Sequence, residues 1–70
     1  MLGDELKRAR LKRGLSQEKL AFEAELDRTY ISQFENNHKS PTVDVLFRIC
    51  RALRAKVSEL IARLEWQWEG

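Results

Sequence analysis

The chain has 70 residues, of which 43% are hydrophobic and 34% are charged, and its net charge at pH 7 is +2. This length allows one small domain with a single core. No run of apolar residues is long enough to span a membrane, and the acidic N-terminus does not resemble a signal peptide. A single cysteine and a single histidine exclude an internal disulfide and a structural zinc site. We therefore expect a small cytoplasmic, all-helical module, too small for a typical enzyme with a substrate cavity.

The charge alternates in sign along the chain. Basic residues outnumber acidic ones by six to three in residues 1–20 and by five to one in residues 38–56. Acidic residues outnumber basic ones by four to one in residues 21–37 and by three to one in residues 57–70. The C-terminal segment is therefore not expected to face a polyanion.

The spacing of apolar residues predicts five helices, over about residues 2–13, 17–24, 28–36, 43–54 and 57–68. The first helix places Leu2, Leu6 and Ala9 on one face. Gly14 follows it, and glycine is the usual residue where a helix ends in a left-handed conformation. No long linker, repeat or low-complexity segment interrupts the pattern, so we expect one domain over residues 1–70.

The second and third helices are short and begin in the same way. Ser16 is the expected N-cap of the second helix, and Leu15 and Leu20 can form a hydrophobic staple around it. Asp27 is the expected N-cap of the third helix, with an apolar pair at the same two positions. The two helices are separated by residues 25–27, and two short helices joined by such a turn are typical of a helix-turn-helix.

The last two helices carry apolar stripes. Thr42 is the expected cap of the fourth helix, and Cys50 is expected to be a small core residue on its buried stripe. Three further residues of this helix are expected to form a solvated basic flank: Arg48, Arg51 and Arg54. The stripe of the fifth helix consists of Val57, Leu60, Ile61, Leu64 and Trp68.

The outward face of the third helix has an unusual composition. An ordinary solvated helix face is rich in Lys and Glu, which favour helix formation. This face carries neutral, hydrogen-bonding residues instead: Thr29, Ser32, Gln33 and Asn36. Gln and Asn can bond bidentately to adenine, and a Thr methyl can contact a thymine methyl. A polar face with no partner remains the alternative, but the short turn and the two staples favour DNA recognition.

Three segments carry a family resemblance: residues 15–21 (LSQEKLA), residues 30–36 (YISQFEN) and Pro41. With them the chain resembles the phage-repressor type of helix-turn-helix protein, the lambda repressor and Cro-like family. Residues 26–32 (LDRTYIS) are especially similar to controller proteins of restriction–modification systems. The resemblance covers roughly residues 2–64 and implies an all-α, five-helix lambda-repressor-like domain.

The resemblance also implies which residues contact DNA. Gln17 would contact a phosphate and brace the third helix. Arg28, Thr29 and Gln33 would read base edges, and the remaining residues would hold phosphates. The full set is Gln17, Arg28, Thr29, Tyr30, Ser32, Gln33, Asn36, Asn37 and Lys39.

Two further implications concern structure rather than contact with DNA. Arg10 and Glu35 match a pair that forms an interhelix salt bridge in the family, so Arg10 is expected to be structural. Glu25 stands in the turn where the family usually has glycine, and a left-handed non-glycine residue costs roughly 1–2 kcal/mol. Asn37 stands at another position where the family commonly has glycine, and it is a milder departure from the family pattern than Glu25.

A second functional surface is expected on the fourth and fifth helices, because their apolar surface is wider than one small core needs. We expect a homodimer interface there, formed by Val45, Phe47, Leu60, Ile61, Leu64 and Trp68. A two-fold dimer would place two recognition helices about 34–36 Å apart and read a palindrome. The alternative is that Trp66 and Trp68 only cover the edge of the core.

The sequence therefore predicts a bacterial or phage-encoded transcriptional regulator that binds double-stranded DNA as a homodimer, with RNA polymerase as a further candidate partner. An autoregulatory restriction–modification controller is the specific form of this hypothesis. An antitoxin-like or other protein-interaction module on the same scaffold is the alternative. No nucleophile–base pair is apparent, and neither a metal, a cofactor nor a small-molecule ligand is expected.

Overall fold

The structure is a computed structural model that describes residues 2–60 and residue 62. Its helices are α1 (Leu2–Lys12), α2 (Gln17–Ala24), α3 (Arg28–Glu35) and α4 (Val43–Leu53). Residues 57–60 and 62 are also helical, which agrees with the start of the predicted fifth helix. All regular structure in the described part of the chain is helical, as predicted.

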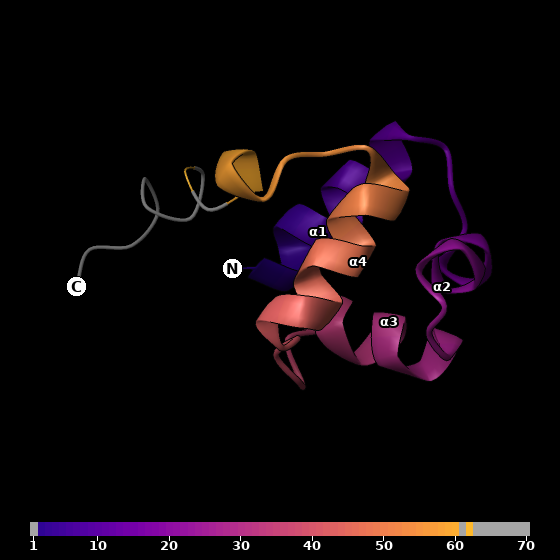
Figure 1. The fold of residues 1–70 in the computed structure, drawn as a ribbon. Helices are drawn as coiled ribbons and strands as arrows, with labels where there is room; N and C mark the ends of the chain where they lie inside the picture. Colours follow the sequence, from indigo (N-terminus) through magenta and orange to yellow (C-terminus); the bar gives the residue numbers. More distant parts are fainter. Residues whose placement is uncertain (1, 61, 63–70) are drawn as a thin grey trace.

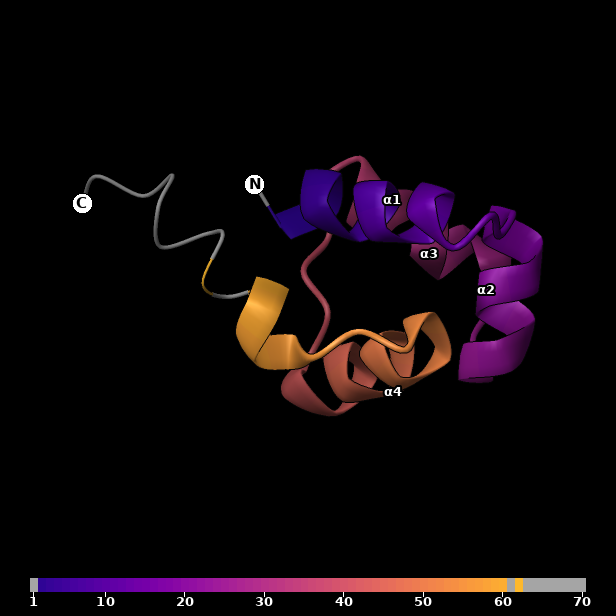
Figure 2. The same cartoon turned by 90° about the horizontal axis from the view of Figure 1, so that it is seen from above.

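The helices are arranged so that α3 lies against two neighbours. In Figure 1, α3 runs below α1 and α4, and α2 stands at the end of the domain opposite the N-terminus. Figure 2 separates α1 from α4, which lie on opposite sides of the domain. The main packing contacts join α2 to α3, α1 to α3, and α2 to α4. The helix-turn-helix unit is therefore held by α1 on one side and by α4 on the other.

Side-chain caps begin three of the helices, as the sequence predicts. The Ser16 hydroxyl accepts a hydrogen bond from the Lys19 amide at 3.0 Å. The Asp27 carboxylate accepts one from the Thr29 amide at 2.9 Å, and the Thr42 hydroxyl accepts one from the Val45 amide at 3.2 Å. Each cap satisfies a backbone N–H that the helix itself leaves without an acceptor.

The helix ends share one geometry. After each of the four helices the chain passes through a left-handed residue, and the N–H of the next residue bonds to a carbonyl five residues earlier, as in a Schellman motif. The left-handed residues are Gly14, Glu25, Asn37 and Arg54. The predicted ends of three helices are wrong by one residue because Arg13, Asn36 and Arg54 already belong to these terminal turns.

The core is formed by the apolar faces of all the helices. The structure confirms Cys50 as a core residue, 2% exposed, and burial raises the pKa of its thiol. The prediction for Leu60 is wrong. It was expected at a dimer interface, but it is 5% exposed and packs in the same core. A helical apolar stripe does not distinguish a face buried within the protomer from one buried between protomers. No helix in residues 2–60 and 62 is long and apolar enough to cross a membrane.

Candidate nucleic-acid interface

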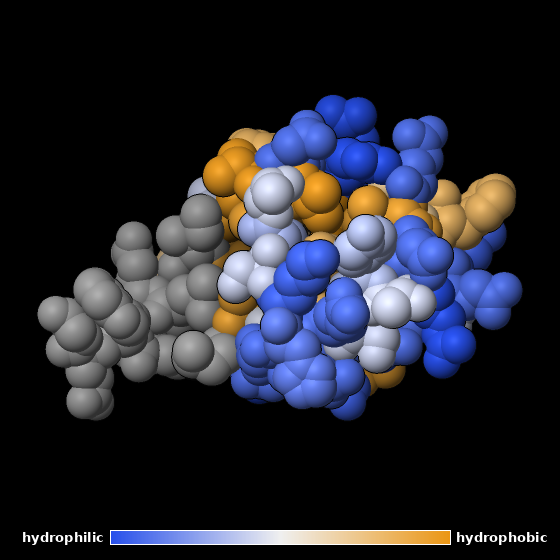
Figure 3. Space-filling view, turned by 90° about the horizontal axis from the view of Figure 1, so that it is seen from below, coloured by the Kyte–Doolittle hydropathy of each residue, from blue (hydrophilic) through white to orange (hydrophobic). Residues whose placement is uncertain are grey.

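The third helix has one buried face and one accessible face. Ile31, Phe34 and Glu35 are buried. Arg28, Thr29, Tyr30 and Asn36 are exposed, and Ser32 and Gln33 are half-buried. Figure 3 views the molecule from below, the side on which α3 lies, and most of this face is neutral to hydrophilic. The residues predicted to face DNA are therefore accessible on the side of α3 that does not contribute to the core.

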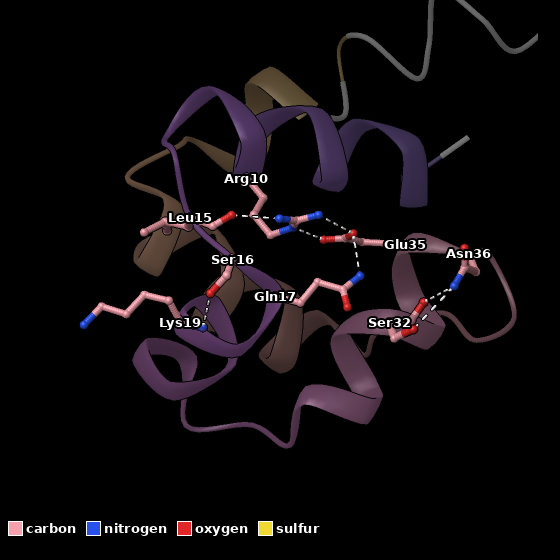
Figure 4. A network of polar contacts seen from close by, with 8 residues as sticks. All are labelled: Arg10, Leu15, Ser16, Gln17, Lys19, Ser32, Glu35 and Asn36. Atoms are coloured by element: carbon pink, nitrogen blue, oxygen red, sulfur yellow. Dashed lines mark hydrogen bonds and ion pairs between the residues drawn. The ribbon is translucent and has the colours of Figure 1, made fainter.

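A polar network fixes the orientation of α3 (Figure 4). Arg10 on α1 forms a bidentate pair with Glu35 on α3, with its Nε 2.7 Å from Oε2 and its Nη2 3.1 Å from Oε1. The Arg10 Nη1 atom also donates to the Leu15 carbonyl at 2.7 Å. Both charged side chains are buried, so the pair depends on this full set of hydrogen bonds. The network contains the ion pair that the family resemblance implies.

Gln17 joins the same network at the start of α2. Its Nε2 atom donates to Glu35 Oε1 at 3.1 Å, which links α2 to α3. The side chain is half-buried. The expected brace between Gln17 and the third helix is thus present in the structure. The phosphate contact expected of Gln17 remains a prediction.

The aromatic residue on the accessible face is held by its neighbours. The ring of Tyr30 stacks with the buried ring of Phe34, with 6.2 Å between centroids. The ammonium of Lys39 lies 4.9 Å from the Tyr30 ring centroid, within the range of a cation–π interaction. Lys39 is thereby positioned beside α3, although it belongs to the loop that follows the helix.

The structure gives two of the predicted contact residues a different local role. The Asn36 Nδ2 atom donates to the Ser32 carbonyl at 2.9 Å, so this side chain folds back along α3. The Asn37 Oδ1 atom accepts a hydrogen bond from the Gly3 amide at 3.0 Å and caps the start of α1. A Cβ at Gly3 would collide with the Phe34 carbonyl oxygen, so the close approach of α1 to this loop requires glycine. The expected phosphate contacts of both asparagines would have to use their remaining atoms.

The turn between α2 and α3 departs from the sequence-based expectation in one respect. Glu25 does adopt the left-handed conformation, with φ 58° and ψ 43°. Arg48, expected to be a solvated residue of α4, donates from Nη2 to the Glu25 carbonyl at 2.7 Å. No short-range sequence pattern indicates this contact, because 23 residues separate the two positions.

The cap of α3 has a perturbed ionisation. The amide and hydroxyl of Thr29 hydrogen-bond to Asp27 and lower the pKa of its carboxyl. Asp27 therefore stays ionised at neutral pH, where its charge also favours the N-terminus of α3. No group of three potential metal-ligating side chains occurs in residues 2–60 and 62.

The predicted dimer residues are only partly within the described chain. Val45 is half-buried and Phe47 is 54% exposed. Val43, one helical turn before Phe47, is 71% exposed and extends the same apolar surface. Leu60 lies in the core, and three predicted interface residues lie outside the described residues: Ile61, Leu64 and Trp68.

Comparison with known proteins agrees with this geometry. A helix-turn-helix family matches residues 6–60. The chain is 39% identical over 62 residues to control protein C.BamHI of Bacillus amyloliquefaciens, an alignment that covers 87% of this chain and 76% of that protein. It is also 39% identical over 64 residues to control protein C.MunI of a Mycoplasma species, covering 90% and 86% of the two chains.

A solved structure gives the same result. The restriction-modification controller protein C.AhdI from Aeromonas hydrophila superposes with a TM-score of 0.82 and 34% sequence identity, covering 84% of this chain and 89% of that chain. The family match over residues 6–60 extends well beyond the helix-turn-helix of α2 and α3. The chain belongs to the helix-turn-helix family and, within it, to the controller proteins of restriction–modification systems.

Proposed function

We propose that the chain is a transcriptional regulator that binds a palindromic DNA operator as a homodimer and places α3 in the major groove. One observation carries the proposal. The outer face of α3 presents neutral hydrogen-bonding side chains, while the Arg10–Glu35 pair locks its inner face to α1. A rigid helix with an accessible polar face is the arrangement that reads base edges.

Within this proposal the residues divide into two groups. Arg28, Thr29 and Gln33 read base edges, because they project from the first two turns of α3, where recognition helices contact bases. The phosphate contacts come from the flanking residues: Gln17, Tyr30, Ser32, Asn36, Asn37 and Lys39. The N-terminus of α2 adds backbone N–H donors beside Gln17.

A fluorescence-anisotropy titration tests DNA binding directly. The probe is a duplex from the region upstream of the protein's own gene, and a scrambled duplex of equal composition is the control. We expect tighter binding to the upstream duplex that persists at moderate salt. Equal binding to both duplexes that disappears as salt rises would contradict sequence-specific recognition, because the nonspecific component is mostly electrostatic.

The homodimer is supported by the apolar surface of α4. Val43 and Phe47 are well exposed one turn apart, and Figure 3 shows apolar surface on the side of the molecule where α4 lies. The net charge of +2 gives one protomer little attraction for phosphates, so two linked protomers bind DNA better than one. Equilibrium sedimentation at tens of micromolar is expected to give a dimer. A monomer at this concentration would contradict the proposal.

RNA polymerase is a proposed further partner. The α2 surface supports a protein contact because Phe22 is 77% exposed there, with the Lys19 ammonium 5.6 Å from its ring centroid. We expect Phe22→Ala to retain DNA affinity but to change transcription in vitro from the upstream promoter. Unchanged transcription with intact DNA binding would remove Phe22 from this role.

The regulator acts in the cytoplasm and needs no catalytic group.

A further inference from the structure

The turn that joins α2 to α3 is built around a backbone carbonyl that the helices do not use. Glu25 is left-handed, and the Leu26 amide bonds back to the Ala21 carbonyl at 2.8 Å. Asp27 then caps α3. The peptide units of this turn set the angle between the two helices, so any group that fixes the Glu25 carbonyl also constrains the direction of α3.

Arg48 supplies such a group from outside the helix-turn-helix. Its Nη2 atom lies 2.7 Å from the Glu25 carbonyl oxygen but 3.9 Å from Glu25 Oε2. The Glu25 side chain is 87% exposed, so solvent screens the contact with its carboxylate. The main contact is therefore a charge-assisted hydrogen bond to the backbone, which does not depend on the side chain at position 25.

The position of Arg48 gives this bond a role in the whole domain. The major contacts of α3 are with α1 and α2, whereas α4 packs mainly against α2. Arg48 therefore connects α4 to the turn immediately before α3. Since α4 also carries the exposed residues Val43 and Phe47 of the proposed dimer surface, the bond ties the reading helix to that surface.

We propose that Arg48 is a positioning residue for DNA recognition, which holds the Glu25 carbonyl and thereby sets the direction of α3 relative to α4. This inference rests on the proposed DNA-binding function. It also explains how Glu25 is accommodated where glycine would be less strained, because the hydrogen bond stabilises the left-handed turn. Arg48 acts through the turn and not by contacting DNA.

A direct phosphate contact is the competing role for an arginine in a DNA-binding protein. The two roles predict different results in DNA-binding experiments. Loss of a phosphate contact weakens binding to all sequences and makes the salt dependence less steep. Loss of a positioning contact weakens binding to the specific site, leaves nonspecific binding almost unchanged and retains the salt dependence.

The test compares Arg48→Met with Arg51→Met, which removes the same charge from the same helix. We expect Arg48→Met to weaken binding to the upstream duplex roughly five-fold, the effect of one lost hydrogen bond, with little change on the scrambled duplex. Arg51→Met should preserve the ratio of the two affinities. Arg48→Lys keeps a donor and should restore part of the preference for the upstream duplex over the scrambled duplex. Glu25→Gln keeps the carbonyl acceptor and should also preserve the ratio.

Amide hydrogen exchange without DNA provides an independent measurement. In Arg48→Met we expect faster exchange of the Leu26 and Thr29 amides, with the Lys19 amide at the start of α2 unchanged. Thermal unfolding confirms that each variant is folded. Equal losses on both duplexes with a shallower salt dependence, or unchanged exchange in the turn, would overturn the inference. A wild-type protein without preference for the upstream duplex would contradict the proposed function instead, and the exchange experiment would still decide the role of Arg48.

Discussion

At the scale of single residues, the buried pair of Arg10 and Glu35 fixes the orientation of α3. Each carboxylate oxygen of Glu35 accepts a hydrogen bond from Arg10, and one also accepts from Gln17. No buried side-chain nitrogen or oxygen atom in the described part of the chain lacks a partner. The complete set of hydrogen bonds offsets the cost of burying two charges.

Removing one partner of this pair should be strongly destabilising. We expect Glu35→Ala to lower the free energy of unfolding by about 3–5 kcal/mol, because it leaves the Arg10 guanidinium buried without its counterion. Urea denaturation followed by circular dichroism measures the change. The double variant Arg10→Met with Glu35→Leu is the control, and it should recover much of the loss. A loss below about 1 kcal/mol in Glu35→Ala would show that the pair does not hold α3.

Asp27 makes the stability of α3 depend on pH. Hydrogen bonds from Thr29 lower the pKa of the Asp27 carboxyl in the folded state. Its contribution to stability is therefore present at neutral pH and is lost as the pH falls through this lowered pKa. We expect the Thr29 amide resonance in NMR spectra to titrate in this acidic range. In Asp27→Asn, which keeps an acceptor without a charge, that titration should disappear. A Thr29 resonance that titrates identically in both proteins would contradict the assignment.

At the scale of helices, three of the four Schellman endings use a residue other than glycine. Arg54 adopts φ 56°, and its side chain is exposed. We expect Arg54→Gly to increase stability by about 1 kcal/mol, because glycine adopts this conformation without steric cost. In a domain of this size that corresponds to a rise in Tm of about 4–8 °C.

Asn37→Gly is the matched comparison for Arg54→Gly. Asn37 has nearly the same φ, 59°, but its side chain also caps α1 through the Gly3 amide. Asparagine tolerates the left-handed region better than arginine, so the gain is smaller and the lost cap opposes it. We expect no gain or a net loss of Tm. An equal rise in Tm for both variants would mean that the cap at Gly3 contributes nothing.

The helix starts could be predicted from sequence because their determinants are local. Each of the caps at Ser16, Asp27 and Thr42 lies within three residues of the amide that it binds. The contact of Arg48 with the turn and that of Asn37 with Gly3 could not be predicted, because each joins residues that only the packed fold brings together. Leu60 was misassigned for a related reason, since helical spacing shows that a face is buried but not what covers it.

At the scale of the whole molecule, the fold separates three surfaces. The accessible face of α3 with Lys39 beside it is the proposed DNA surface, the exposed side of α4 is the proposed dimer surface, and the α2 surface around Phe22 is the proposed polymerase contact. In this proposal, DNA affinity and DNA specificity depend on different residues. We expect Gln33 to supply specificity through a contact with a base edge, and Lys39 to supply affinity through a phosphate contact.

The measurement that tests this account most directly is the affinity of Gln33→Ala and Lys39→Ala for the upstream duplex and the scrambled duplex over a range of salt concentrations. We expect Gln33→Ala to lose roughly 1–3 kcal/mol on the upstream duplex and almost nothing on the scrambled one. Lys39→Ala should weaken both complexes and make the salt dependence less steep. If both variants lost the same affinity on both duplexes, α3 would not be the helix that reads the operator.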